Sequence, residues 1–252
     1  MSKKHNGLLW RVLKIWATCL ILAFCVLGVI AVKRVGVPVV TMYREASKDV
    51  AKSSKDTFKA EQTSLVYDAE GNEIKKLKQE KDVSYLDYED IPDAAKLAII
   101  SIEDKNFTTH HGIDVEGVAR AGLSLILNRG NITMGGSTIT QQLLKNTVFT
   151  EWTSETSFID KLERKIQEQY LAVQLEKKVS KNWIMENYLN AINLGQNTLG
   201  VAVASERYFG KDVSELTLSE CAVLAAITQN PSRFNPISNP EKNAERRMKV
   251  LN

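Results

Sequence analysis

The chain has 252 residues, of which 44% are hydrophobic and 25% are charged, and its formal net charge is +3. This composition fits one globular domain with an additional segment. The weak positive charge, without a concentrated Lys/Arg stripe, argues against a nucleic-acid-binding protein. The three cysteines show no CxxC or Cys/His spacing, so the sequence predicts neither a zinc site nor a disulfide framework.

An apolar run near the N-terminus predicts a membrane anchor. Residues 15–32 carry no charge, and at ~1.5 Å per residue such a helix spans about 27 Å, close to the thickness of a bilayer core. The run is longer than the apolar part of a signal peptide, and no clear cleavage site follows it. We therefore predict one uncleaved transmembrane helix, followed by a membrane-proximal linker or helix over residues 33–62. Basic residues flank both sides of the run, so the positive-inside rule leaves the orientation open.

The remaining chain is predicted to be mainly α-helical after one small β-hairpin. Residues 64–68 and 73–77 are strand-like and are separated by turn residues. Ile91-Pro92-Asp93 opens a helix that ends near residues 103–105. Residues 128–136 are predicted to form a loop. Further helices are predicted over residues 115–127, 138–146, 159–178, 181–194, 201–209, 219–228 and 241–252.

The thirteen residues 102–114, at and beyond the end of the first of these helices, include several chemically active side chains. Glu103 and Asp104 stand side by side, and His110 and Gly112 follow. On residue types alone, an ordinary solvent-exposed helix end is the favoured interpretation. A histidine beside a glycine turn is also more often a structural hydrogen-bonding residue than a catalytic base. Only the segments downstream favour a site.

The segment GGSTITQQLLKN, residues 135–146, has the composition of an anion-binding site. Its Gly-Gly-Ser-Thr opening leaves backbone N–H groups free at a helix start. Gln141 and Lys145 share a helix face at the i, i+4 spacing. These groups suit a pyrophosphate, although the P-loop spacing is absent. A Ser/Thr cap on a polar helix explains the same residues equally well.

A second carboxylate lies far along the chain from Glu103. Arg164 and Glu168 are four residues apart on a predicted helix, and an isolated pair of this kind is usually a solvated helix face. Carboxylates paired across a cleft are typical of glycosyl chemistry, where one acts as acid or base and the other stabilises charge. We nominate Glu103 and Glu168 as such a pair, on the condition that they face one another.

Five ordered segments together resemble the family 51 peptidoglycan glycosyltransferases. They are EDKNFTTHHGID, GGSTITQQLLKN, RKIQEQYLAVQLE, IMENYLNAINLGQNTLGVAVASERYFGK and ELTLSECAVLAAITQNPSRFNP. The resemblance covers residues 64–252, and five motifs in the right order make it specific. This module occurs alone in monofunctional enzymes and at the front of bifunctional penicillin-binding proteins.

The resemblance implies a lysozyme-like, mainly α fold with two lobes and a groove between them, the smaller lobe lying partly in the membrane. It implies an inverting hexosyltransferase that polymerises lipid II into β-1,4-linked glycan strands and releases polyprenyl pyrophosphate. The catalytic domain, residues 63–252, would lie on the outer face of a bacterial cytoplasmic membrane, with residues 1–14 as a cytoplasmic tail. The implied partners are lipid II, the nascent glycan strand, membrane lipid and cell-wall assembly proteins, and not nucleic acid.

By motif match, the resemblance implies that Glu103 is the general base that deprotonates the 4-hydroxyl of lipid II. Glu168 would be a second acid near the donor pyrophosphate, and His110 and Gly112 would shape the turn. A divalent cation, magnesium or manganese, is implied at the leaving pyrophosphate, and no organic cofactor. The implied substrate-binding residues are Asp104, Phe107, Gly136, Ser137, Thr138, Gln141, Gln142, Lys145, Arg164 and Asn235.

One stretch departs from the family pattern. Many members carry a phosphate-contacting arginine shortly before the third motif, where this chain has Thr156. Lys161 and Arg164 are the predicted replacements, and the sequence does not choose between them.

Two other functions stay open, and so does the C-terminal extent of the domain. A lytic or hydrolytic enzyme on the same scaffold would not need a pyrophosphate site, and a non-catalytic membrane scaffold would not need both carboxylates. The chain stops inside its last predicted helix, so we expect the domain to be truncated at its C-terminal end. Whether a transpeptidase domain follows residue 252 is undecided from the sequence.

Overall fold

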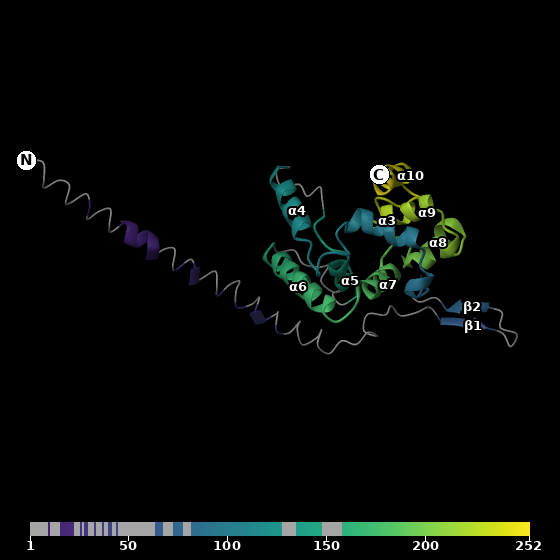
Figure 1. Ribbon diagram of the computed structural model, residues 1–252, viewed down its shortest axis with the longest axis horizontal. Helices are drawn as coiled ribbons and strands as arrows, with labels where there is room; N and C mark the ends of the chain where they lie inside the picture. Colours follow the sequence, from purple (N-terminus) through teal and green to yellow (C-terminus); the bar gives the residue numbers. More distant parts are fainter. Residues whose placement is uncertain are drawn as a thin grey trace, which may run out of the picture.

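A computed structural model describes residues 82–127, 135–147 and 158–252, the strand residues 64–67 and 73–77, and isolated positions between residues 10 and 44. The described part is mainly helical, as predicted (Figure 1). Most of the predicted tail (1–14) and linker (33–62) lies outside the described residues. The predicted anchor lies partly outside them, and no helix among the described residues is long and apolar enough to cross a membrane.

The strands form two small pairs. The predicted hairpin is confirmed: β1 (Ser64–Tyr67) pairs antiparallel with β2 (Glu73–Leu77). A second pair was not predicted. It joins β3 (Asp82–Val83) in parallel to β4 (Thr198–Leu199). Because these strands are two residues long and more than a hundred residues apart in sequence, local alternation does not reveal them.

The predicted helices are present with small shifts at their ends. Two of them, α4 (Val115–Leu127) and α8 (Val201–Phe209), have the predicted bounds. In contrast, α7 (Lys181–Ala191) does not reach the predicted end at Leu194, because the backbone of Ile192 is extended and its carbonyl accepts from the Gly200 N–H. The helices are α3 (Asp93–Glu103), α4 (Val115–Leu127), α5 (Ile139–Thr147), α6 (Phe158–Glu176), α7 (Lys181–Ala191), α8 (Val201–Phe209), α9 (Leu218–Ile227) and α10 (Pro240–Leu251), with 3-10 turns η3 (Tyr88–Asp90) and η5 (Val213–Glu215).

Side-chain caps explain where two of these helices begin. The Ser180 hydroxyl accepts from the Trp183 N–H at the start of α7. Thr217 and Glu220 form a reciprocal capping box at the start of α9. Each cap satisfies a backbone donor that the helix itself leaves unpaired.

The hydrophobic core surrounds α9 and α5. Residues 221–227 of α9 are all buried, and α9 packs against α3 and α10, whereas α5 packs against α6 and α7. Figure 1 shows α3, α8, α9 and α10 on one side of the molecule, α4 and α6 on the other, and α5 and α7 between them. Apolar side chains on α4, namely Val115, Leu123 and Leu127, are exposed to solvent.

Candidate active site

A cavity of about 740 Å³ brings together most of the residues that the sequence nominated. The predicted residues Phe107, His110, Gly112, Arg164 and Asn235 do not line it. The predicted residues that line it are Glu103, Asp104, Gly136, Ser137, Thr138, Gln141, Gln142, Lys145 and Glu168. Further lining side chains that sequence reasoning missed include Arg120, Asn146, Thr228, Gln229, Arg246 and Lys249.

Glu103 is the last residue of α3, and three other elements hold its carboxylate. Gln142 Nε2 of α5 donates to Oε2 over 2.9 Å. The Thr228 hydroxyl, at the end of α9, donates to Oε1. Arg246 of α10 reaches the same oxygen at 3.3 Å. The Glu103 side chain is 12% exposed, so a solvated helix end is excluded, and its carboxylate has a defined orientation.

Tyr188 of α7 stands behind Gln142. Its hydroxyl donates to Gln142 Oε1 over 3.0 Å, and the residue is fully buried. Burial, supported by the negative charges of Glu103 and Asp104, raises the pKa of Tyr188 well above its usual value. The phenol therefore keeps its proton at neutral pH and can donate to Gln142.

Glu168 of α6 is also buried, at 4% exposure, and its main partner is a lysine that sequence reasoning missed. Lys165 Nζ donates to Glu168 Oε2 over 2.9 Å, to Ser137 Oγ over 2.7 Å and to Gln141 Oε1 over 3.1 Å. Arg164 lies at 3.8 Å from Glu168 Oε1. The i, i+3 spacing of Lys165 and Glu168 was the available signal. Glu168 is not on a solvated helix face.

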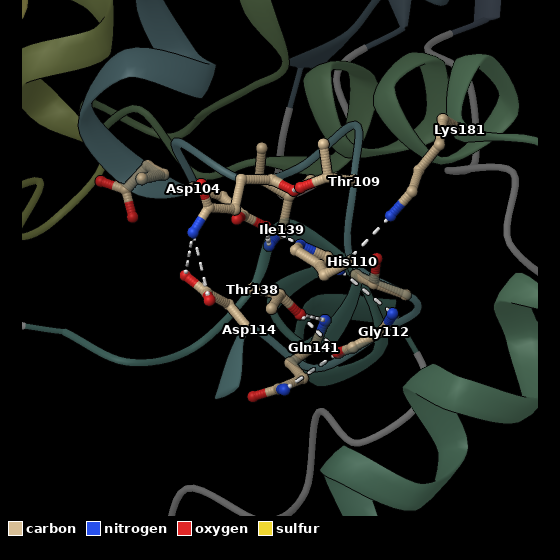
Figure 2. A network of polar contacts seen from close by, with 12 residues as sticks. Asp104, Thr109, His110, Gly112, Asp114, Thr138, Ile139, Gln141 and Lys181 are labelled. Atoms are coloured by element: carbon tan, nitrogen blue, oxygen red, sulfur yellow. Dashed lines mark hydrogen bonds and ion pairs between the residues drawn. The ribbon is translucent and has the colours of Figure 1, made fainter. Parts of the chain in front are cut away.

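The turn after Glu103 is a closed hydrogen-bond network (Figure 2). Gly112 N–H donates to His110 Nδ1 over 3.1 Å, which assigns the ring proton to Nε2. Nε2 in turn donates to Asp104 Oδ2 at 2.8 Å. The same oxygen accepts from the Ile139 N–H over 3.0 Å, so Asp104 caps the start of α5.

Gly112 ties this turn to α5 and α6. Its carbonyl accepts from Thr138 Oγ1 over 2.9 Å and from Gln141 Nε2 over 3.1 Å (Figure 2). Its φ is +89°, and a Cβ there would lie 2.6 Å from the backbone of Ala172. Only glycine therefore fits this position without movement of α6.

Two nominated substrate residues lie inside the protein. Phe107 is buried below Lys181, whose Nζ is 4.6 Å from the ring centroid and 2.8 Å from Glu176 Oε1. Asn235 is buried as well and donates to the Tyr208 hydroxyl over 3.1 Å. Their roles in substrate binding stay predictions.

The cavity wall carries both signs of charge. Lys145, Arg246 and Lys249 line it together with the carboxylates. Arg120 of α4 also lines it and lies 3.4 Å from Asp114. Burial would raise the pKa of Asp114, but hydrogen bonds from Gly117 N–H and Asn106 and the charge of Arg120 outweigh it, so that pKa lies below its usual value.

The structure describes only part of the stretch in which this chain has Thr156 in place of the arginine of many family members. Thr156 lies outside the described residues. Of its two predicted replacements, Arg164 lies beside Glu168 and Lys161 is exposed, and neither lines the cavity.

Fold and site together define a helical protein with two carboxylates in one cavity, Glu168 buried and Glu103 half-buried, an arrangement used for glycosyl chemistry. The family model described as Transglycosylase matches residues 70–252. The chain therefore belongs to the transglycosylase family, family 51 of the glycosyltransferases.

Named relatives agree with this assignment. The chain is 41% identical over 185 residues to penicillin-binding protein 1A of Clostridium botulinum (strain Hall), which covers 72% of this chain and 21% of the relative. It is 38% identical over 229 residues to that of Clostridium perfringens (strain 13), covering 90% and 32%. It is 38% identical over 241 residues to penicillin-binding protein 1A of Neisseria cinerea, and this match covers 95% of this chain and 28% of the relative. The chain thus spans between 21% and 32% of these relatives.

A crystal structure of penicillin-binding protein 1A from Haemophilus influenzae is also similar. It has 22% sequence identity and a TM-score of 0.36, and the match covers 76% of this chain and 18% of that chain.

Proposed function

We propose that the chain is an inverting peptidoglycan glycosyltransferase that polymerises lipid II into β-1,4-linked glycan strands and releases polyprenyl pyrophosphate. One observation carries this proposal: Glu103 and Glu168, from separate helices, line the same cavity. Membership of the transglycosylase family supports the reaction type. The lysozyme-like, two-lobed description of residues 63–252 belongs to the same proposal.

Glu103 would act as the general base. The lipid II 4-hydroxyl gives its proton to the carboxylate while its oxygen attacks the anomeric carbon of the growing strand. The bond from that carbon to the pyrophosphate oxygen breaks on the opposite face, so the configuration inverts. Donors from three elements support this role, since they hold the carboxylate in one orientation before substrate arrives.

The donor pyrophosphate would lie on the α5 side of the cavity. Gly136, Ser137 and Thr138 precede that helix, and Lys145 lies on its last turn. An ammonium and the helix start both favour negative charge there. Lys165 would supply positive charge near the leaving group, because its ammonium touches Ser137, and Glu168 would hold that ammonium in place. Gln141, Gln142 and Arg164 complete the proposed binding set, and Asp104, Phe107 and Asn235 would support its walls.

A magnesium or manganese ion is part of the proposal only as an ion bound by the substrate pyrophosphate. Among the described residues, no group of three or more His, Cys, Asp or Glu side chains could hold a metal ion. The described residues therefore do not fit a metal site made by the protein alone.

The proposed setting is the outer face of a bacterial cytoplasmic membrane, with residues 15–32 as a single-pass anchor. The exposed apolar residues Val115, Leu123 and Leu127 of α4 support contact of this helix with lipid. Gly117 and Arg120 of the same helix line the cavity. A lipid-linked substrate would then reach the cavity from the membrane. Cell-wall assembly proteins are proposed partners because membership of the transglycosylase family implies them.

Incubation of the chain with lipid II in detergent tests this proposal. Polymer and released polyprenyl pyrophosphate are expected, whereas cleaved sugars without polymer would favour the lytic alternative, and no product at all would favour the scaffold.

Glu168→Gln tests the second acid. The polymerisation rate is expected to fall about 100-fold, because Lys165 loses its charged partner. Glu206→Gln, which alters an exposed carboxylate of α8, is the matched control and should polymerise like the wild type. A Glu168→Gln enzyme that matches this control would assign Glu168 a structural ion pair only.

A further inference from the structure

A buried phenol, that of Tyr188, is linked to the proposed general base Glu103 through one intervening side chain. Tyr188 lies in the C-terminal half of α7, and none of its surface is exposed. A phenylalanine would fill the same apolar space, so the hydroxyl needs a separate explanation. That hydroxyl donates to Gln142 Oε1 over 3.0 Å.

Both ends of the Gln142 amide are used. Oε1 accepts from Tyr188, and Nε2 donates to Glu103 Oε2 over 2.9 Å. The oxygen and nitrogen of an amide exchange places when the group rotates by half a turn, and only hydrogen-bond partners select one orientation. The Glu103 carboxylate can only accept, so it pairs with the NH2 group, and the Tyr188 hydroxyl donates to the amide oxygen and holds the amide in this orientation. The three groups then form a directed chain, in which each hydrogen bond polarises the next.

The two oxygens of Glu103 depend on different elements. Thr228 and Arg246 both bind Oε1. In the part of the chain that the structure describes, Gln142 is the hydrogen-bond donor to Oε2. The direction of this second oxygen therefore depends on the orientation of the Gln142 amide.

We propose that Tyr188 is a positioning residue for the glycosyl transfer: its hydroxyl orients the Gln142 amide, and this amide orients the Glu103 carboxylate toward the acceptor hydroxyl. The inference rests on the proposed function of Glu103. Tyr188 does not line the cavity, so it acts through Gln142 and not on the substrate.

Tyr188→Phe removes the hydroxyl and keeps the ring that packs in the core. We expect kcat for lipid II polymerisation to fall about three- to tenfold, the range of one lost neutral hydrogen bond, with KM unchanged. The matched control is Tyr85→Phe, because the Tyr85 hydroxyl bonds to Glu186 of α7, the helix that also carries Tyr188, and Tyr85 does not line the cavity. This control should keep the wild-type kcat.

A double-mutant cycle separates positioning from packing. Gln142→Met removes the amide at nearly constant length, so Tyr188→Phe should cause no further loss in that background. Multiplicative losses in the double variant would overturn the inference, and so would a Tyr188→Phe enzyme with wild-type kcat. Rates are expressed per folded molecule, measured by thermal denaturation of the same samples, so that partial unfolding of a variant does not imitate the effect.

Different results would refute the proposed function and the positioning role of Tyr188. A wild-type chain that makes no polymer refutes the proposed function. A polymerising wild type with an unaffected Tyr188→Phe variant refutes only the positioning role.

Discussion

Replacement of Glu103 by glutamine removes the negative charge and changes the shape very little. In the structure, Thr228 and Arg246 donate to one carboxylate oxygen and Gln142 to the other. Glutamine turns one of these oxygens into an NH2 group, which cannot accept. Whichever position the nitrogen takes, it faces a donor. The variant therefore loses both the basic group and part of its positioning.

The expected activity loss is much larger than the expected stability loss. A positioned general base contributes about 10²- to 10⁴-fold, which is roughly 3 to 5 kcal/mol of activation free energy. The Arg246 guanidinium loses its charged partner, and the two side chains are only 13% and 12% exposed. Loss of this partner should lower the free energy of unfolding by ~1–3 kcal/mol. Since domains of this kind unfold with about 5–15 kcal/mol, most molecules stay folded.

The assay is polymerisation of lipid II per folded molecule, with thermal denaturation of the same samples. Glu176→Gln is the matched control, because it also breaks a buried ion pair, with Lys181 Nζ at 2.7 Å from Glu176 Oε2, and Glu176 does not line the cavity. It should lose similar stability and retain activity within a few-fold. A Glu103→Gln enzyme with a rate near wild type would refute the assignment of the base.

Three further changes test other parts of the structure. Lys165→Met removes the ammonium that joins the loop serine, a glutamine and the second carboxylate, and we expect about a tenfold or greater loss of kcat/KM in the same assay; a rate equal to wild type would exclude this role. Gly112→Ala places a Cβ 2.6 Å from the backbone of α6 at φ +89°, so urea denaturation should show a loss of ~2–4 kcal/mol in unfolding free energy. Gly210→Ala, at φ +62° with no atom within 4 Å, should cost only ~1–2 kcal/mol, and equal losses would contradict the steric argument. Glu220→Gln addresses pH: hydrogen bonds from a lysine and the capping threonine lower the carboxyl pKa from 4.5 to about 2, so its stabilisation is complete above pH ~4.5 and is lost as the pH falls through 2. The variant should show a flatter dependence of unfolding free energy on pH in this window, and an unchanged slope would show that the capping carboxylate is not linked to folding.

Local sequence patterns were sufficient for most elements of the described fold. The apolar periodicity of residues 115–127 and 201–209 predicted α4 and α8 with their bounds, and turn residues predicted the hairpin of β1 and β2. These features depend on interactions within a few residues, so the local sequence carries them. The short pair of β3 and β4 depends on contacts across the whole domain, and no local pattern predicted it.

The sequence by itself determined which residue types make up the candidate site, through the ordered motifs around Glu103 and Glu168. Only the tertiary structure decided what each residue touches. Gln141 and Gln142 are neighbours in sequence, yet Gln141 accepts from Lys165 beside Glu168 and Gln142 donates to Glu103. Adjacent residues on a helix point about 100° apart, so the packing of α5 between α6 and α7 assigns one glutamine to each carboxylate. The same packing places Tyr188 behind Gln142, a contact between residues 46 positions apart that no local pattern contains.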